Sequence, residues 1–244
     1  MPDQPGEHFL TFLRKEQITH DTYSFFFTRP LQSFDFLPGQ YIKMFLDLPK
    51  DDPRGRNRSF SICSSPEQKD VLMITTKESE SKSIFKQTLY QLRSGDNVRF
   101  FGPLGRFVLP EQSDKPLVLL AGGIGITPFH SMLLHAASVN YQREIFLFNS
   151  YHSVEEIVFY EELKNLSQNH RGINVIFTVS NPDRSWKGET GRISGEMIKK
   201  YVSNFMDAEY MLCGPTEMVV SMLAILDEMK ILDEHIQEEM FTGY

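Results

Sequence analysis

The sequence has little cysteine: Cys63 and Cys213 are the only two in 244 residues, and they lie far apart. Two thiols form no disulfide framework and cannot supply the four thiolates that hold an iron–sulfur cluster. The seven histidines lack the HxxxH and HExxH spacings of metal sites, and His130 and His135 would lie on different faces of a helix. We therefore expect no metal site in this chain.

Long apolar runs and an excess of positive charge are also absent. No run approaches the roughly 18 apolar residues that a membrane-spanning helix requires, and residues 1–8 lack the basic start and apolar stretch of a secretory signal. The 32 acidic residues outnumber the 25 basic ones, which gives a net charge of −7. A surface of this sign repels nucleic acid and anionic membranes. These absences predict a cytoplasmic protein with no nucleic-acid partner and no membrane span.

The composition is otherwise that of a globular protein. Hydrophobic residues make up 41% of the chain, charged residues 23%, and the 20 phenylalanines favour packed interiors over disorder. The length allows one large domain or two domains of roughly 100 to 130 residues. The order of the expected strands and helices decides between these two organisations.

The first half of the chain consists of short runs rich in β-forming residues, separated by turn residues. One helical window, over residues 83–92, has its apolar side chains on one face. Six strands at this spacing favour a small antiparallel barrel. They are expected over residues 8–15, 22–29, 40–48, 58–63, 70–77 and 97–101.

After Pro116 the pattern changes to alternating strands and helices. Buried strands are expected over residues 117–121, 145–150, 174–178, 209–213 and 236–240, with helices near 128–138, 155–167, 194–202 and 216–229. This alternation predicts a doubly wound α/β domain with a five-stranded parallel sheet. A polar stretch separates the two patterns. We therefore expect a six-stranded antiparallel β-barrel domain over residues 1–112 and an α/β domain over residues 113–244.

The strongest local motif is the sequence LLAGGIGITP over residues 119–128, an apolar strand that continues into glycines and a helix start. Thr127 is expected to cap the helix and Pro128 to occupy its first position. The glycines would let a pyrophosphate approach bare backbone amides. It is not the Rossmann fingerprint, because Pro128 replaces the third glycine and Glu144 begins the next strand instead of ending it. The alternative is a tight turn without a ligand.

Two further motifs have a possible binding role. In RSFSICSSP, over residues 58–66, Arg58 could bind a phosphate, Phe60 could stack on a ring from the same strand face and Ser61 would bring a hydroxyl close to it. An ordinary basic strand with an exposed aromatic is the alternative. In MLCGP, over residues 211–215, a sharp turn ends a second parallel strand at the edge where such sheets bind ligands. A buried Cys213 before a loop is the alternative there.

Taken in order, these motifs resemble the ferredoxin-NADP reductase superfamily of flavoprotein oxidoreductases. Each motif is weak by itself, and the ordered set is specific and covers nearly the whole chain. The motifs are PGQY (38–41), Arg58 with Phe60 and Ser61, GD (95–96), GPLGRF (102–107), the glycine turn (122–128), GETGRI (188–193), CGP (213–215) and EMFTGY (239–244).

The resemblance implies a flavin-binding barrel, an NAD(P)-binding α/β domain and delivery of the nicotinamide to the flavin across the cleft between them. It implies FAD, with FMN less favoured, and NADH or NADPH as co-substrate. Supporting roles at the reacting rings are implied for Ser61, Thr127, Cys213, Glu239 and Phe241, and Phe241 or Tyr244 would cover the flavin. Cofactor contacts are implied for Arg58, Ser59, Phe60, Ser61, Thr76, Lys77, Lys82, Ser83, Gly122, Gly123, Gly125, Thr127, Pro128, Ser150, Cys213, Gly214, Pro215 and Phe241.

Three positions depart from the family pattern. Phe60 replaces the commoner tyrosine, which keeps the stacking face and loses a hydroxyl. The glycine that usually precedes Ser83 is missing, and Lys82 would compensate by charge. His152 stands where relatives that use NADP often have arginine, and a neutral histidine is a poor partner for a 2'-phosphate. This last departure favours NADH.

The sequence therefore predicts hydride transfer from NAD(P)H to bound FAD, followed by electron transfer to a separate acceptor such as a ferredoxin, a flavodoxin, a haem protein, an oxygenase or a small oxidant. Two cysteines cannot hold the cluster of a fused ferredoxin domain, so the acceptor is expected to be another molecule. Two alternatives stay open. One is a non-catalytic flavin-binding or nucleotide-binding subunit of a larger complex, and the other is a nucleotide-binding barrel protein without flavin.

Overall fold

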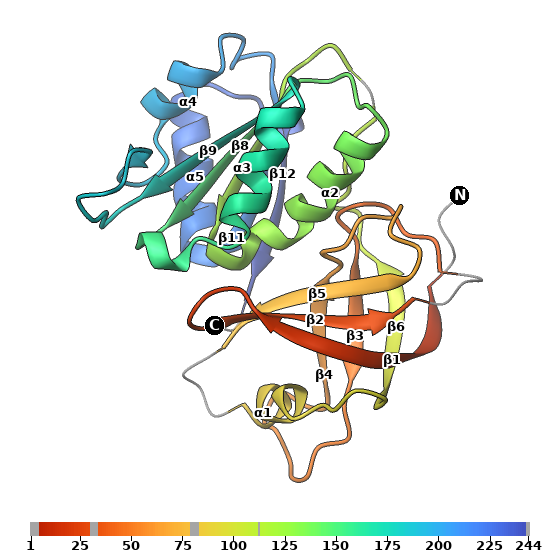
Figure 1. The fold of residues 1–244 in the computed structure, drawn as a ribbon. Helices are drawn as coiled ribbons and strands as arrows, with labels where there is room; N and C mark the ends of the chain where they lie inside the picture. Colours follow the sequence, from red (N-terminus) through yellow and green to blue (C-terminus); the bar gives the residue numbers. More distant parts are fainter. Residues whose placement is uncertain (1–4, 30–33, 79–82, 112, 243–244) are drawn as a thin grey trace. The chain divides into compact units, whose positions relative to one another are not determined.

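The computed structural model describes residues 5–29, 34–78, 83–111 and 113–242 (Figure 1). It divides into two compact units. Unit 1 comprises Met1–Leu109 together with His130–His135, and unit 2 comprises Pro110–Phe129 and Ala136–Tyr244. The predicted boundary after residue 112 stays a prediction, since Gln112 lies outside the described residues.

Unit 1 is a nearly closed six-stranded antiparallel barrel, which confirms the predicted fold of the first half. The strand order is β4-β3-β6-β1-β2-β5. The amide of Cys63, just after β4, donates to the carbonyl of Met73 in β5 at 2.8 Å and brings the two ends of this order together. The strands are β1 (Gly6–Gln17), β2 (Thr22–Thr28), β3 (Tyr41–Phe45), β4 (Asn57–Ser61), β5 (Val71–Lys77) and β6 (Asn97–Leu104).

The alternation of side chains along these strands fills the barrel with aromatic rings. In β6, for example, Val98 and Phe100 are buried while Asn97, Arg99 and Phe101 are exposed. Phe27 lies against Phe100 with ring centroids 5.0 Å apart. The helix α1 (Ile84–Tyr90) adds Ile84, Phe85 and Leu89 to the same core.

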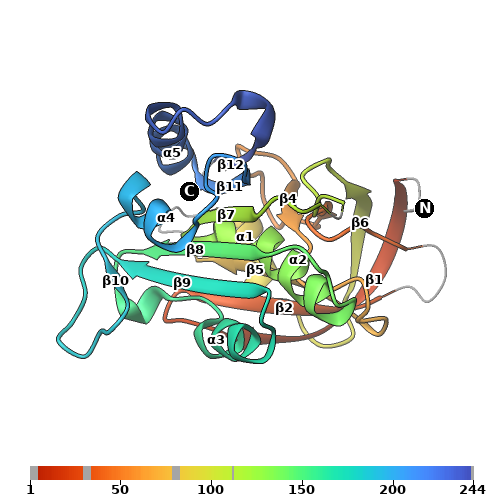
Figure 2. The ribbon, with the colours of Figure 1, turned by 90° about the horizontal axis from the view of Figure 1, so that it is seen from above.

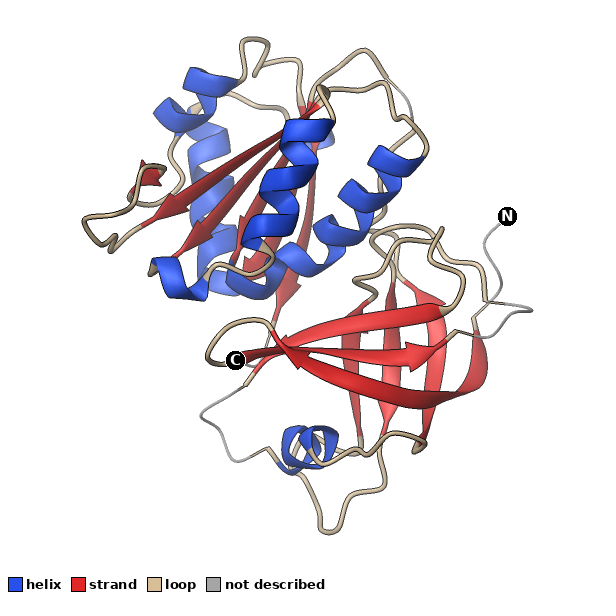
Figure 3. Ribbon diagram, in the orientation of Figure 1, coloured by secondary structure: helices blue, strands red, loops and turns tan. Residues whose placement is uncertain are grey.

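Unit 2 is a parallel sheet in the order β10-β9-β8-β7-β11-β12. Helix α3 lies on one face of the sheet, and α4 and α5 lie on the other (Figures 2 and 3). The strands are β7 (Leu117–Gly122), β8 (Ile145–Tyr151), β9 (Ile173–Val179), β10 (Glu189–Thr190), β11 (Glu209–Pro215) and β12 (Ile236–Phe241). The helices are α2 (Ile126–Ser138), α3 (Tyr160–Asn169), α4 (Gly195–Tyr201) and α5 (Thr216–Glu228), with 3-10 turns η1 (Gly123–Gly125), η2 (Val154–Glu156) and η3 (Asp233–His235).

The sheet has one strand more than the five predicted, because β10 adds two residues beside β9. Two residues are too few to show a strand pattern in sequence. The preceding segment is held by the single tryptophan, whose indole N–H donates to the carbonyl of Glu189 at 2.8 Å. A Cβ at Gly188 would lie 2.3 Å from a ring atom of Trp186, so a larger residue there would have to displace the ring.

In the part of the chain that the structure describes, no helix combines the length and the apolar character needed to cross a bilayer. The same residues bring together no group of three His, Cys, Asp or Glu side chains that could hold a metal ion.

Candidate functional site

The glycine turn of unit 2 leads from β7 through η1 into α2. Gly123 has a left-handed backbone (φ 53°), and a Cβ there would meet no atom within 4 Å. A Cβ at Gly125 would instead lie 2.1 Å from the carbonyl oxygen of Cys213. Gly125 thus packs backbone against backbone on the second turn, while Gly123 leaves open space. The two turns that sequence analysis placed at one sheet edge are in contact.

The predicted role of Thr127 as a helix cap is wrong. Helix α2 begins at Ile126, and the Thr127 hydroxyl donates to the carbonyl of Ile124 at 3.0 Å. A hydroxyl that donates to this carbonyl holds the 3-10 turn η1 closed instead of accepting an amide bond from the next turn. The signal was ambiguous because threonine caps helices and also bonds backward to carbonyls. Pro128 lies buried in the first turn of α2, where no amide partner is required.

Strand register brings the remaining candidates of unit 2 to the same edge. Gly122 in β7 pairs with Ser150 in β8. Cys213 in β11 pairs with Glu239 in β12, and two residues further along Pro215 pairs with Phe241. Parallel strands bind ligands at the carboxyl edge on which all of these residues lie.

The pair formed by Cys213 and Glu239 has perturbed proton affinities. Burial, with a smaller contribution from Glu239, raises the pKa of the Cys213 thiol well above its usual value, so the thiol stays protonated. Burial also raises the pKa of Glu239 to about 7. Its Oε2 atom is buried and has no hydrogen-bond partner among the described residues. A carboxyl group that titrates near neutral pH can hold or release a proton under ordinary conditions.

In unit 1 the candidates of β4 differ in exposure. Ser61 is buried, Ser59 is exposed, and Phe60 is half-buried with its ring centroid 6.2 Å from that of Phe85 in α1. Phe60 pairs with the buried Ile42 of β3 and packs against the barrel core. An aromatic ring in this position has a supported edge and keeps part of its surface accessible, which suits stacking on a planar ligand.

Arg58 does not point into open space. Its Nη2 atom donates to Asp52 Oδ1 at 2.7 Å, and its Nη1 atom donates to the carbonyls of Arg54, Gly55 and Asn57 at 2.7 to 3.0 Å. The exposed fraction is 11% for the Arg58 side chain and 2% for the Asp52 side chain. Sequence analysis singled out Arg58 and missed Asp52.

The other candidates of unit 1 lie on β5 and before α1. Thr76 is buried, and Lys77 forms an ion pair with Asp21 at 3.0 Å. Ser83 is the N-cap of α1 and accepts from the amide of Lys86 at 3.3 Å, and its hydroxyl donates to Asp52 Oδ2 at 3.1 Å. The predicted candidates Lys82 and Tyr244 lie outside the described residues.

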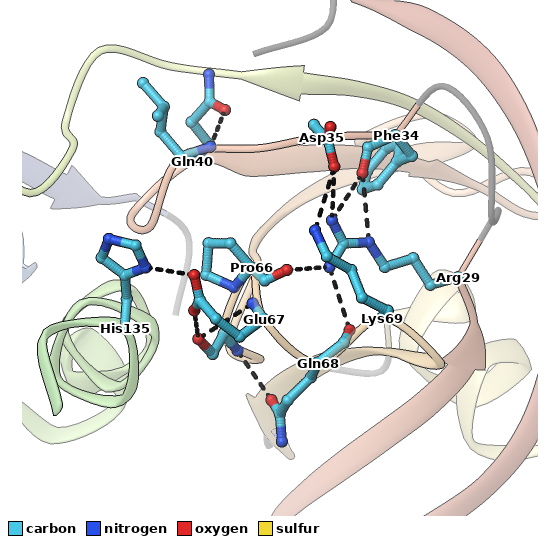
Figure 4. Close-up of polar contacts among 11 residues, drawn as sticks. Arg29, Phe34, Asp35, Gln40, Pro66, Glu67, Gln68, Lys69 and His135 are labelled. Carbon is cyan, nitrogen blue, oxygen red and sulfur yellow. Dashed lines mark hydrogen bonds and ion pairs between the residues drawn. The ribbon is translucent and has the colours of Figure 1, made fainter. Parts of the chain in front are cut away.

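The turn that follows β4 is tied down by a network that sequence analysis also missed. Arg29, with a side chain 2% exposed, donates to the carbonyls of Phe34, Pro66 and Gln68 (Figure 4). Glu67 in this turn accepts from His135 at 2.9 Å. The burial of Arg29 and the bond between Glu67 and His135 depend on contacts with residues distant in sequence. Motif spacing therefore gives no signal for them.

Two other residues of α2 reach the same turn. His130, buried, lies with Nδ1 2.7 Å from the carbonyl oxygen of Cys63, so Nδ1 carries the proton of this bond. Ser131 donates to the carbonyl of Ser64 at 2.7 Å. These bonds explain why residues 130–135 belong to unit 1, since they fix the turn that begins two residues after Ser61.

The candidate residues of unit 1 and those of unit 2 both have chemistry that suits phosphorylated ring ligands. In unit 1, burial and the positive charges of Arg54 and Arg58 lower the pKa of Lys86 to about 8, as in a cluster that favours an anion. In unit 2, the open backbone at Gly123 beside the start of α2 is suited to a pyrophosphate. That the two sets meet around one flavin and one nicotinamide stays a prediction.

The family comparisons agree with this division of roles. Residues 10–109 match the family model described as the oxidoreductase FAD-binding domain, and residues 119–223 match the oxidoreductase NAD-binding domain.

Curated relatives are similar over most of the chain. A flavohemoprotein of Bacillus subtilis is 27% identical over 237 residues, which cover 93% of this chain and 57% of the relative. A glycine betaine monooxygenase reductase subunit of Chromohalobacter salexigens is 25% identical over 241 residues, which cover 97% and 64%. A probable flavin reductase of Photobacterium leiognathi is 28% identical over 192 residues, which cover 78% and 79%. The chain thus spans less than two thirds of the length of the first two.

Solved structures share the fold. An Amycolatopsis cytochrome P450 reductase has a TM-score of 0.85 at 22% identity, covering 99% of this chain and 71% of the other. A ferredoxin NADP+ reductase of Neisseria gonorrhoeae has a TM-score of 0.78 at 21% identity, covering 96% and 98%.

A barrel that matches an FAD-binding domain, followed by a parallel sheet that matches an NAD-binding domain, defines a two-domain flavoprotein oxidoreductase. Within that class, the two matched domains and the shared fold support the ferredoxin-NADP reductase superfamily that the sequence motifs resemble.

Proposed function

We propose that this chain is an NAD(P)H-dependent flavoprotein reductase that passes hydride from the nicotinamide to FAD and then electrons to a separate acceptor. The observation that carries the proposal is the tandem order of the two matches, with the FAD-binding domain on the barrel and the NAD-binding domain on the sheet. The flavin, when bound, supplies the ability to accept hydride and to release electrons singly or in pairs.

The roles of the protein residues are to bind, orient and hold a proton. Phe60 offers a supported ring face for stacking, and Gly123 leaves room for the nucleotide at the start of α2. The protonated Cys213 thiol and the Glu239 carboxyl lie side by side on β11 and β12. We assign these two groups a positioning and proton-holding role, because neither is an activated nucleophile.

The acceptor is proposed at the level of chemical class. The relatives are named as a flavohemoprotein, a monooxygenase reductase subunit and a probable flavin reductase. We therefore propose a haem protein, an oxygenase component, a small redox protein or free flavin as the acceptor.

Anaerobic mixing with NADH tests the proposal. The purified chain, supplied with FAD, should lose its absorbance near 450 nm at a rate on the order of 1 to 1000 per second. Flavin that binds and stays oxidised would contradict the reductase assignment and favour the non-catalytic subunit. A chain that binds no flavin would contradict the flavoprotein assignment as well.

We propose that NADH is the better donor. His152, just beyond β8, is exposed, and its Nδ1 atom lies 3.3 Å from the hydroxyl of Ser180 just beyond β9. Both residues follow the carboxyl ends of their strands, and neither supplies the fixed positive charge that a 2'-phosphate favours. Repeating the anaerobic reduction with NADPH should give a lower rate at equal concentration, and an equal or higher rate would overturn this preference.

A further inference from the structure

The loop between β3 and β4 carries a buried acidic side chain. Asp52 accepts four hydrogen bonds: from the amides of Arg54 and Phe85 at 2.9 and 3.0 Å, from the Ser83 hydroxyl at 3.1 Å and from Arg58 at 2.7 Å. Its side chain is 2% exposed. This carboxylate therefore sits where an arginine, a hydroxyl and two amides converge, which is the donor set that also suits a phosphate group.

Both terminal nitrogens of Arg58 donate to groups of the protein itself. Nη1 donates to three backbone carbonyls and Nη2 donates to Asp52, and the guanidinium carbon lies 5.0 Å from the ring centroid of Phe85. A bidentate contact from Arg58 to a phosphate needs two adjacent N–H groups. Through the Nη1 and Nη2 pair, such a contact requires the loss of the Asp52 contact, of backbone carbonyl contacts, or of both.

The surroundings keep Asp52 ionised. Although burial opposes ionisation, the bonds from Phe85, Arg54 and Arg58 and the charge of Arg58 lower the pKa of Asp52 far below its usual value. The nearby Lys86 feels the repulsion of Arg54 and Arg58, and Glu78 offsets part of it. The cluster thus contains the cations Arg54, Arg58 and Lys86, and in Asp52 an internal anion that is already bound to Arg58.

We propose that Asp52 is an internal counter-ion that competes with the flavin phosphate for Arg58, so that the phosphate adds little to flavin affinity. Binding through the phosphate exchanges one anion–arginine contact for another, and the net gain is small. The ring and the ribityl chain then supply most of the affinity, and the flavin exchanges with solution. This inference rests on the proposed function, because it concerns the flavin site of the proposed reductase.

Three flavins that differ only in their phosphate-bearing part test the proposal. Riboflavin has no phosphate, FMN has one and FAD has a pyrophosphate. Each is titrated into the flavin-free chain while the quenching of flavin fluorescence is followed. In the parent, FMN and FAD should bind less than about tenfold tighter than riboflavin. In Asp52→Asn, which keeps the shape and removes the charge, FMN and FAD should bind about tenfold tighter than in the parent. Riboflavin should bind equally to both.

The neighbouring Asp51 provides a matched control, because it is exposed and Asp51→Asn makes the same change of net charge. That variant should leave all three affinities unchanged. Unchanged or weaker binding of FMN and FAD to a folded Asp52→Asn would overturn the proposal and make Asp52 a support of Arg58.

The parent alone provides a second measurement if Asp52→Asn fails to fold. If the parent binds FMN more than about a hundredfold tighter than riboflavin, Asp52 does not compete effectively with the phosphate and the proposal is overturned. If the parent binds none of the three flavins, the proposed function fails together with this inference. If the parent binds flavin and NADH reduces it, but the phosphate dominates affinity, only this inference fails.

Discussion

At the residue scale, Glu239 makes stability depend on pH. The pKa of a glutamate in an unfolded chain is about 4.3, and that of Glu239 in the folded chain is about 7. Between these values the folded chain holds a proton that the unfolded chain has lost. Folding stability should therefore fall as pH rises from about 4.5 to about 7, by up to about 4 kcal/mol, and then level off.

Glu239→Gln should remove this decline. We expect the denaturation temperature of the parent to drop between pH 5 and pH 8 by several degrees more than that of the variant. Glu238→Gln serves as the control, because the adjacent glutamate is exposed on the same strand. An equal decline in the parent and in Glu239→Gln would show that Glu239 is not the group responsible.

The residue scale also marks the limit of sequence analysis. Arg58, Phe60 and Cys213 could be singled out because each belongs to a motif that follows or forms a strand. Asp52 could not, because its importance depends on burial and on donors from α1, some thirty residues later in the chain. Composition and motif spacing identify candidate side chains. The partner of a buried charge is determined by tertiary contacts, which they do not reveal.

At the element scale, two glycines of one turn should respond differently to alanine. Gly125→Ala places a Cβ against the Cys213 carbonyl, which neither backbone can avoid, and should lower the free energy of unfolding by about 3 kcal/mol. Gly123→Ala meets open space and only strains a left-handed backbone, which costs about 1 kcal/mol. Urea denaturation followed by circular dichroism measures both, and equal losses would contradict the contact between the two turns.

The elements themselves were largely predictable. The six strands of the barrel and five of the six strands of the sheet were expected near their observed positions, because each combines β-forming residues with flanking turn signals. β10 was not expected, since its two residues carry no period. The start of α2 was misplaced because the 3-10 turn η1 precedes it and uses the Thr127 hydroxyl as a donor.

At the scale of the whole molecule, the change of pattern after Pro116 correctly indicated a barrel followed by a parallel sheet. The assignment of residues 130–135 to unit 1 was beyond sequence analysis. It arises from bonds between α2 and a turn more than sixty residues earlier, and no local pattern encodes them.

A fragment ending at residue 112 should therefore be less stable than one ending at residue 138. The shorter fragment lacks His130 and Ser131, so the carbonyls of Cys63 and Ser64 lose their partners, and it also lacks the bond from His135 to Glu67. We expect a deficit of roughly 2 to 4 kcal/mol in urea unfolding. Equal stability of the two fragments would show that residues 1–112 fold without help from α2.

The lone tryptophan of the chain sits beside β10, with its indole N–H bonded and its ring against Gly188. Tryptophan fluorescence therefore comes from unit 2 alone, and unit 1 contributes no tryptophan signal. A single fluorescence trace thus reports the melting of one half of the protein without labelling, and its comparison with a signal from the barrel shows directly whether the halves unfold together.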